Sequence, residues 1–226
     1  RSSDLITAFM AVVVKIAAFA GFFRLFSSAF HLVPELWINL MWVLAVLSMT
    51  VGNLMAIQQH SIKRMLAYSS IAHAGYMMVA ILVAPAEFGG SVAVVFYLIA
   101  YSAMTLGSLA IVLAVAAPYL SGNHPDDISR FNALAKRQPV LAALMALFML
   151  SLAGIPPGMA GLLAKFFVFS AAVKAGFIGL AVIGMLNSAV SAYYYLRVIV
   201  AMYFMEGKQG ETYAKPYVSV PLCTAL

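Results

Sequence analysis

The stretch SLAGIPPGMAGLLAKFFVF, residues 151–169, is almost wholly apolar, yet it contains two adjacent prolines and Lys165. The apolar run around it extends from about 140 to 174, which as one straight helix would be roughly 50 Å long against a hydrocarbon core of about 30 Å. Proline removes a backbone donor and clashes with the preceding helical turn. The stretch therefore predicts two half-helices joined by an irregular segment at 154–158, with Gly154, Pro156, Pro157 and Gly158 at the break.

The composition of the whole chain indicates that its solvent is a lipid bilayer. Of the 226 residues, 65% are hydrophobic and 9% are charged, whereas a soluble domain is nearer half apolar and one quarter charged. A single cysteine, Cys223, excludes a disulfide framework and a cysteine-based metal site. The expected fold class is all-α, a polytopic transmembrane helix bundle with one discontinuous helix at 154–158.

Apolar runs of sufficient length divide the chain into spans. The expected spans are about 5–30, 37–57, 66–83, 91–120, 140–174 (broken) and 176–204, with the start of another at 218. We interpret 1–226 as a single transmembrane domain. Because the sequence opens on Arg1 and stops within a new apolar run, we expect it to be a fragment of a longer protein.

The distribution of Lys and Arg orients these spans. If the loops alternate sides, one face holds only Arg24 and Lys174, and the opposite face holds Lys63, Arg64, Arg130, Lys136, Arg137, Lys208 and Lys215. The positive-inside tendency places the second set, and with it loops 58–64 and 121–139, on the cytoplasmic side. The net charge of +6 is not gathered into a stripe or tail, so no nucleic-acid partner is expected.

Three titratable residues, Lys15, His73 and Lys165, fall near mid-depth on three different spans. A lysine at a helix centre costs roughly 2.5–3.5 kcal/mol on insertion scales, which favours a functional reason for keeping it. Burial disfavours the charged form of a lysine, and histidine exchanges protons near neutral pH. The pattern predicts a proton relay through these three side chains.

Two structural alternatives remain open. Each cation can instead pair with a carboxylate, but all seven acidic residues lie at span ends or in loops, so a buried partner would have to come from missing sequence or another chain. The adjacent prolines can also form a kink that only shapes packing. For His73, an ordinary hydrogen-bonded histidine is as well supported as a carrier.

Polar rows on two spans can support a hydrated path. Tyr101 and Thr105 continue a row from Tyr97, and Tyr195 ends a row that begins at Ser188. Such rows hold chained waters or form interhelical contacts. Only one histidine lies within a span, and the sequence has no phosphate loop, cysteine cluster or dinucleotide fingerprint. We therefore expect no catalytic residue, metal, cofactor or redox centre on this chain.

Three segments resemble the antiporter-like subunits of respiratory complex I. They are GNLMAIQQHSIKRMLAYSSIAHAGYMMVAILV (52–83), SLAGIPPGMAGLLAKFFVFSAAVKAG (151–176) and NSAVSAYYYLRVIVAMYF (187–204). The resemblance implies a protein of fourteen spans with two inverted five-helix repeats, of which 5–30 is the eighth span and the following five form the second repeat. It also implies that Lys15, His73 and Lys165 pass protons along a hydrated mid-membrane axis, and it matches Lys63 to a basic pair that begins the tenth helix.

The function that this resemblance implies is proton translocation by a membrane subunit of a bacterial NADH:quinone oxidoreductase. The expected partners are other membrane subunits of the complex, the lipid bilayer, and protons and water as the transported species, in the bacterial inner membrane. Two alternatives stay open: a subunit of a cation/proton antiporter complex or membrane-bound hydrogenase, and a scaffold subunit whose charges only brace helices.

Overall fold

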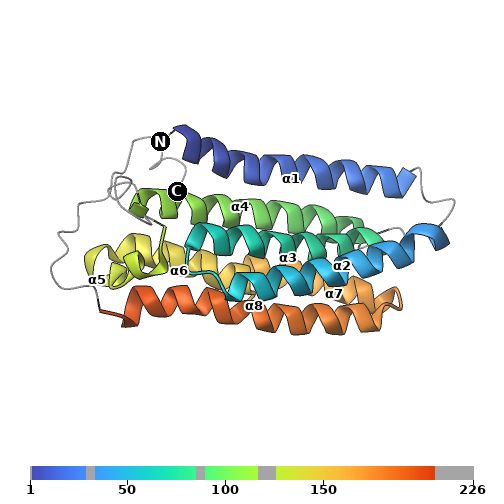
Figure 1. Cartoon of the computed structure of the whole chain (residues 1–226). Helices are drawn as coiled ribbons and strands as arrows, with labels where there is room; N and C mark the ends of the chain where they lie inside the picture. The colour runs from blue at the N-terminus through green and yellow to red at the C-terminus, as the bar shows by residue number, and fades with distance from the viewer. Residues whose placement is uncertain (1, 29–33, 85–89, 117–125, 207–226) are drawn as a thin grey trace.

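The computed structural model describes residues 2–28, 34–84, 90–116 and 126–206, and these residues are almost entirely helical (Figure 1). The predicted start of a span at 218 lies outside the described residues, as do the ends of the expected spans at 29–30 and 117–120. The elements are α1 (Ser2–Ser28), α2 (Pro34–Ile57), α3 (Ile62–Val83), α4 (Gly90–Ala116), the 3-10 helix η3 (Ile128–Phe131), α5 (Leu134–Arg137), α6 (Pro139–Ala153), α7 (Met159–Lys174) and α8 (Ile178–Phe204).

The long helices lie nearly parallel in one bundle, with α1 at one edge and α8 at the opposite edge (Figure 1). Helix α3 packs along α2 and also contacts α4, α7 and α8, so it lies at the centre. Within the described residues, four helices are long and apolar enough to cross a membrane: Trp37–Ile57, Ile62–Val83, Ser91–Ala116 and Ile178–Phe204. The expected all-α, multi-pass membrane architecture is confirmed.

The outside of the bundle is as apolar as its core. Leu47, Ile99, Phe166 and Leu186 lie on four different helices and each exposes more than half of its side chain. The interior also contains polar side chains, including His73 and Lys165. Soluble proteins instead expose polar side chains and bury apolar ones. Apolar side chains on the outside suit a bundle that is surrounded by lipid or by neighbouring membrane subunits, because they are not in contact with water there.

The predicted helix break is confirmed. Helices α6 and α7 follow one another along the bundle, and residues 154–158 between them are not helical (Figure 1). Pro139 begins α6, a position where proline is tolerated because that N–H has no helical partner. The two halves are 15 and 16 residues long, so each half alone is too short to cross the hydrocarbon core.

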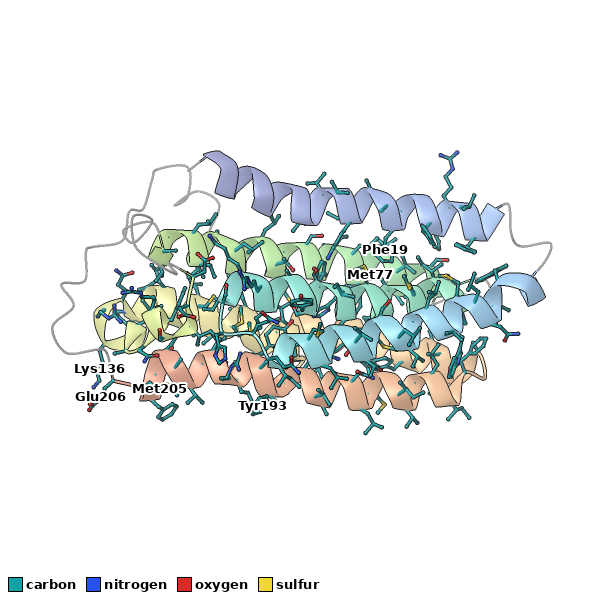
Figure 2. The ribbon with its side chains drawn as sticks, in the orientation of Figure 1. Phe19, Met77, Lys136, Tyr193, Met205 and Glu206 are labelled. Atoms are coloured by element: carbon teal, nitrogen blue, oxygen red, sulfur yellow. The ribbon has the colours of Figure 1, made fainter. Side chains whose placement is uncertain are left out.

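One end of the bundle is closed by the segment that contains η3 and α5. Ser61, which precedes α3, forms an isolated antiparallel bridge with Asp127. Asn132 donates a side-chain hydrogen bond to the Glu206 carbonyl, and Lys136, Met205 and Glu206 gather at this end (Figure 2). The basic loop segments 58–64 and 126–137 therefore share one end of the molecule, as the expected orientation requires.

Candidate functional site

The last carbonyls of α6 accept hydrogen bonds from the backbone or from Lys165, although the helix ends inside the bundle. Gly154 has a φ of 82°, and its N–H bonds to the Ser151 carbonyl while the Ile155 N–H bonds to the Leu150 carbonyl. This is the Schellman pattern of a helix that ends on a left-handed glycine. The carbonyls of Leu152 and Ala153 receive no backbone hydrogen bond from this motif. Pro156 and Pro157, which follow Ile155, have no N–H groups that could supply one.

Lys165 supplies the missing donors. Its Nζ lies 3.0 Å from the Leu152 carbonyl oxygen, 2.8 Å from that of Ala153 and 2.9 Å from Ser188 Oγ. The side chain is only 5% exposed. The ammonium group also lies at the C-terminal end of α6, where the helix dipole favours a cation. The lysine and the helix break therefore depend on each other. Lys165 supplies donors to the free carbonyls of α6, and those carbonyls supply acceptors to the buried ammonium group.

The partners of Lys165 among the described residues are uncharged. The sequence left open a carboxylate partner from outside the chain, whereas the three hydrogen bonds of Lys165 go to two carbonyls and a hydroxyl. An ammonium group has three donors and no acceptor, so the three bonds match its capacity.

The first turn of α7 packs against the end of α6 because glycine stands at the contact. A Cβ added at Gly161 would lie 1.7 Å from the Ser151 carbonyl oxygen, closer than any real contact. The Gly161 N–H, an orphan donor of the first turn, bonds to Ser151 Oγ at 3.1 Å. Gly161 thus belongs to the break with Gly154 and Gly158, although the sequence pattern did not single it out.

His73 is enclosed by tyrosines. Its Nδ1 lies 2.7 Å from the Tyr97 hydroxyl and its Nε2 lies 3.1 Å from that of Tyr195, and the ring of Tyr101 is 5.0 Å away between centroids. His73 and these tyrosines are almost fully buried. A neutral imidazole donates from one nitrogen and accepts at the other, so one tyrosine accepts from the ring and the other donates to it.

Tyr76 lies between the histidine and the lysine. Its ring centroid is 5.6 Å from that of His73, and the Lys165 Nζ lies 5.5 Å from the centre of the same ring. Half-buried Lys15 lies on α1, which contacts α4 and α3. The structure thus brings His73 of α3 and Lys165 of α7, two of the three residues that the sequence predicted as a relay, to the same tyrosine ring.

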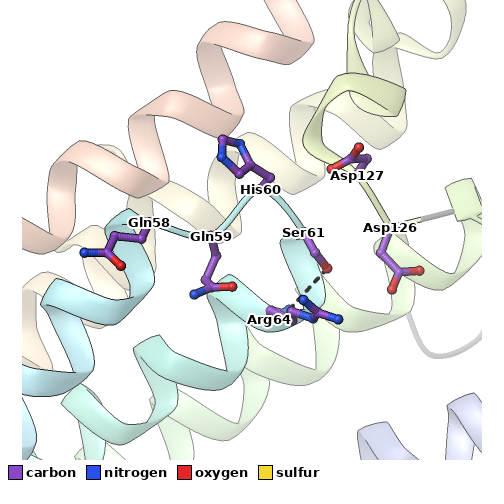
Figure 3. A pocket seen from close by; sticks show the side chains of 7 residues that line it. All are labelled: Gln58, Gln59, His60, Ser61, Arg64, Asp126 and Asp127. Atoms are coloured by element: carbon purple, nitrogen blue, oxygen red, sulfur yellow. Dashed lines mark hydrogen bonds between the residues drawn. The ribbon is translucent and has the colours of Figure 1, made fainter. Parts of the chain in front are cut away.

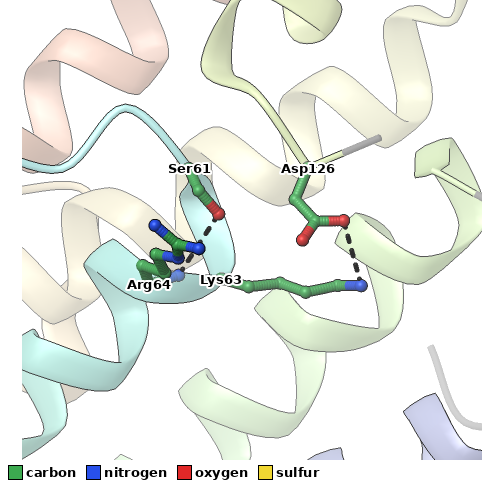
Figure 4. A network of polar contacts seen from close by, with 4 residues as sticks. All are labelled: Ser61, Lys63, Arg64 and Asp126. Carbon is green, nitrogen blue, oxygen red and sulfur yellow. Dashed lines mark hydrogen bonds and ion pairs between the residues drawn. The ribbon is translucent and has the colours of Figure 1, made fainter. Parts of the chain in front are cut away.

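The supporting residues divide into two groups. Tyr101 and Tyr195 contact His73, and buried Thr105 lies one helical turn from Tyr101 on α4. Lys63 lies elsewhere, ten residues before His73 on α3 and hence about 15 Å along the helix. Its Nζ is 3.1 Å from Asp126 Oδ1, and both side chains are about one quarter exposed (Figure 4). The structure does not bring Lys63 together with the relay residues.

The end of the bundle near Lys63 contains a cavity between the start of α3 and the segment that closes this end. This cavity of about 530 Å³ is lined by Gln58, Gln59, His60, Ser61, Arg64, Asp126 and Asp127 (Figure 3). Its lining residues are polar or charged, and a space of this size admits water. Arg197 of α8 donates to the Ile57 and Gln59 carbonyls beside it, which fixes the end of α2.

A second cavity, of about 560 Å³, reaches Lys165 from the side of α7 and α8. We call it the α7–α8 groove. It is lined by Gly154, Leu162, Lys165, Phe166, Phe169, Ser170, Val173, Lys174, Met185 and Ser188. The groove is mainly apolar, with the Lys165–Ser188 pair at one place and Lys174, in the last turn of α7, at another.

A polar network between α2 and α8 was not predicted. The buried Asn53 amide donates to the Asn187 carbonyl at 3.0 Å, and its Oδ1 accepts from the Tyr194 hydroxyl at 2.9 Å. Asn187 in turn donates to Thr50 Oγ1 at 3.4 Å. An asparagine inside an apolar span is itself a sequence signal for such contacts, since a buried amide requires partners.

Among the described residues, no group of three or more His, Cys, Asp or Glu side chains is placed to hold a metal ion. The site contains a lysine, a histidine and surrounding hydroxyl groups, which donate and accept hydrogen bonds. Of these side chains, histidine ordinarily exchanges protons near neutral pH.

Comparison with known proteins identifies what the chain is similar to. A family described as NADH:quinone oxidoreductase/Mrp antiporter, transmembrane, matches residues 1–191. NADH-quinone oxidoreductase subunit N of Trichlorobacter lovleyi is 46% identical over 97% of this chain and 44% of its own length. The chain thus spans less than half the length of this curated relative.

Two solved structures have the same fold. A chain of respiratory complex I from Thermus thermophilus with bound Aureothin matches 97% of this chain and 46% of its own length, with a TM-score of 0.77 and 34% identity. A chain of the Mrp complex from Dietzia sp. DQ12-45-1b matches 92% of this chain and 37% of its own length, with a TM-score of 0.82. At 22% identity, the second likeness shows the fold alone.

Proposed function

This chain belongs to the NADH:quinone oxidoreductase/Mrp antiporter family of transmembrane proteins, and on that premise we propose that it is part of subunit N of a bacterial NADH:quinone oxidoreductase. In this proposal it carries protons through the membrane arm by way of Lys15, His73 and Lys165. The chain takes part in an enzyme as a subunit of a multi-subunit translocase, and the redox centres are on other subunits.

The observation that carries the proposal is the position of Lys165. Its ammonium group is buried at an interrupted helix, bonded to two freed carbonyls and to Ser188, and linked through Tyr76 to His73. Intramembrane lysines of this kind are expensive and mark ion pathways. Broken helices line such pathways because their free backbone groups need a partner or water.

The two tyrosine hydroxyls that bond to His73, those of Tyr97 and Tyr195, support proton transfer through its ring; we call these three side chains the His73 cage. When the ring accepts a proton, both nitrogens become donors, so both the Tyr97 and the Tyr195 hydroxyls must accept. One tyrosine hydroxyl therefore reverses its direction each time the imidazole is charged or discharged. Since Tyr76 contacts both His73 and Lys165, two positive charges there would repel each other, and these groups are expected to hold protons in turn rather than together.

The proposal also covers the surroundings of the chain. Its partners are other membrane subunits of the same complex, the lipid bilayer, and the transported protons and water, with no nucleic acid and no cofactor of its own. We place it in the bacterial inner membrane with loops 58–64 and 121–139 on the cytoplasmic side. The support for this orientation is the excess of basic residues at the end where Ser61 pairs with Asp127.

The rival functions have less support. A cation/proton antiporter or hydrogenase subunit would keep the same fold, and the likeness to the Mrp complex at 22% identity does not reach function. A scaffold subunit would need its buried charges only as braces. The bonds of Lys165 do brace the helix break, so only a measurement of proton transport separates the two roles.

The test replaces Lys165 by alanine in the full enzyme, with Lys174→Ala as the matched control on the same helix. Lys174 is exposed in the last turn of α7. NADH-driven acidification of proteoliposomes is measured per assembled complex. Lys165→Ala is expected to lower pumping by about 100-fold or more, since a positioned group that transfers protons typically contributes at least that factor, and Lys174→Ala is expected to retain it.

Pumping by Lys165→Ala at the level of Lys174→Ala would contradict the proton-carrying role. If the complex assembles poorly with Lys165→Ala but pumps normally per assembled unit, the scaffold function is the correct one. The variant Lys165→Arg serves as a further check, because it keeps a buried cation that cannot lose its proton, and it is expected to pump as poorly as alanine.

A further inference from the structure

The three partners of Lys165 are not equivalent. The carbonyl oxygens of Leu152 and Ala153 can only accept hydrogen bonds, whereas the Ser188 hydroxyl can accept or donate. A charged lysine donates to all three. A neutral lysine has two N–H groups and one lone pair, and a carbonyl facing that lone pair would repel it.

Only one arrangement satisfies the neutral amine without moving the chain. The two N–H groups stay on the two carbonyls of α6, and the lone pair faces Ser188, whose hydroxyl turns round to donate. Ser188 is thus the single contact of Lys165 whose direction follows the charge on the lysine. On this basis we propose that the proton of Lys165 enters and leaves through Ser188, an inference that rests on the proposed proton transport.

The step conserves atoms and charge. One Nζ–H bond of Lys165 breaks as an O–H bond forms on Ser188 Oγ, and the original Ser188 O–H breaks as its proton passes to a water molecule. The lysine becomes neutral, the serine is again a hydroxyl, and the positive charge leaves on the water. Loading of the lysine is the reverse, and serine never holds the charge for longer than the transfer.

The surroundings of Ser188 suit this role. Lys165 is nearly fully buried, while Ser188 on α8 is half-buried, and both line the α7–α8 groove of about 560 Å³. Water needs polar partners as well as room, and the Lys165–Ser188 pair offers them in a mainly apolar lining. Ser188, the more exposed of the two, therefore gives the ammonium group a hydroxyl contact at the wall of the space that can admit the accepting water.

The test compares Ser188→Thr with Ser188→Val in the full enzyme, because these side chains have nearly the same shape and only threonine has the hydroxyl. Ser170→Val is the matched control, since Ser170 lines the same groove but does not bond to the Lys165 Nζ. Pumping and NADH oxidation are measured per assembled complex. Ser188→Val is expected to lower pumping about 100-fold, while Ser188→Thr and Ser170→Val keep most of it.

Equal pumping by the threonine and valine variants would overturn the role of Ser188. If both pump well while Lys165→Ala pumps poorly, proton transport through Lys165 stands and only the serine step is wrong. If Lys165→Ala also pumps normally, the proposed function itself fails. A variant that assembles poorly is still informative, since the rates are compared per assembled complex and the hydroxyl difference between Thr and Val remains.

Discussion

At the scale of single residues, the site depends on groups that change hydrogen-bond direction when they change charge. His73 has a tyrosine hydroxyl on each ring nitrogen, and Lys165 has a serine hydroxyl beside its two carbonyls. Hydroxyl groups are the natural partners for a titrating side chain, because they donate or accept as required. A carboxylate partner would instead hold the cation in one state.

Tyr195→Phe tests this view of His73. The change removes the hydroxyl that lies 3.1 Å from Nε2 and takes the hydrogen-bond partner from a buried nitrogen in both charge states of the ring, at a cost of about 1–3 kcal/mol. Since about 1.4 kcal/mol corresponds to a factor of ten in rate, we expect NADH-driven pumping to fall by about tenfold, as measured per assembled complex in proteoliposomes.

Tyr193→Phe is the control for that variant. Tyr193 lies two residues earlier on α8, is 60% exposed and points away from the bundle (Figure 2). It loses the same hydroxyl from the same helix without touching His73. A fall in pumping of equal size in both variants would mean that the loss is general and that the cage around His73 has no special part in transport.

The sequence was sufficient to single out Lys15, His73 and Lys165 as candidates, and their role in a relay stays a prediction, but it did not predict their partners. A titratable side chain inside an apolar span is visible without a structure, because its insertion cost marks it. The two α6 carbonyls that bind Lys165 carry no side-chain signal at all. Tyr76 was missed for a different reason, since an aromatic residue in a span is usually packing material.

At the scale of elements, the interrupted helix of α6 and α7 is the decisive feature. The break was predictable because two prolines within an apolar run that is too long for one span leave little choice. The contact of Lys165 with the end of α6 was not predictable, because it depends on the angle between the two half-helices. Gly161 was overlooked because glycine is required there by the close approach of α7 to Ser151. That contact cannot be seen in the sequence, since it depends on how the two half-helices pack.

Gly154→Ala is expected to damage the break. At a φ of 82°, alanine costs about 1–2 kcal/mol relative to glycine. The added Cβ would also lie 3.2 Å from Lys165 Cδ and 3.4 Å from Nζ, which pushes the ammonium group away from its acceptors. We therefore expect a lower unfolding temperature of the assembled complex together with reduced pumping.

Gly176→Ala separates these two effects. Gly176 has a similar φ of 85°, but a Cβ there meets nothing within 4 Å. Both alanine variants are therefore expected to lose a similar amount of thermal stability, and only Gly154→Ala is expected to pump more slowly. Slow pumping in Gly176→Ala as well would show that backbone strain, and not the displacement of Lys165, limits transport.

At the scale of the whole molecule, the bundle places its polar groups in two regions. One is the end near Ser61 and Asp127, with a cavity lined by polar side chains and the Lys63–Asp126 pair. The other is the interior cluster around His73 and Lys165, covered by apolar helices. Composition and basic-residue asymmetry predicted this division, whereas the pairing of segments 60–62 and 126–128 is a long-range contact without a local sequence pattern. The single-domain interpretation of 1–226 stays a prediction.

In the proposed relay, hydroxyl groups and water beside Tyr76 connect Lys165 with His73 inside the membrane. The most direct measurement is an electron cryomicroscopy map of the assembled enzyme that resolves ordered water. We expect water within hydrogen-bond distance, about 3 Å, of Ser188 Oγ, and further water continuing toward the Tyr195–His73 pair. Dry apolar packing around both Ser188 and Tyr195, with the Lys165 Nζ enclosed by its carbonyls and no water beside it, would contradict the account.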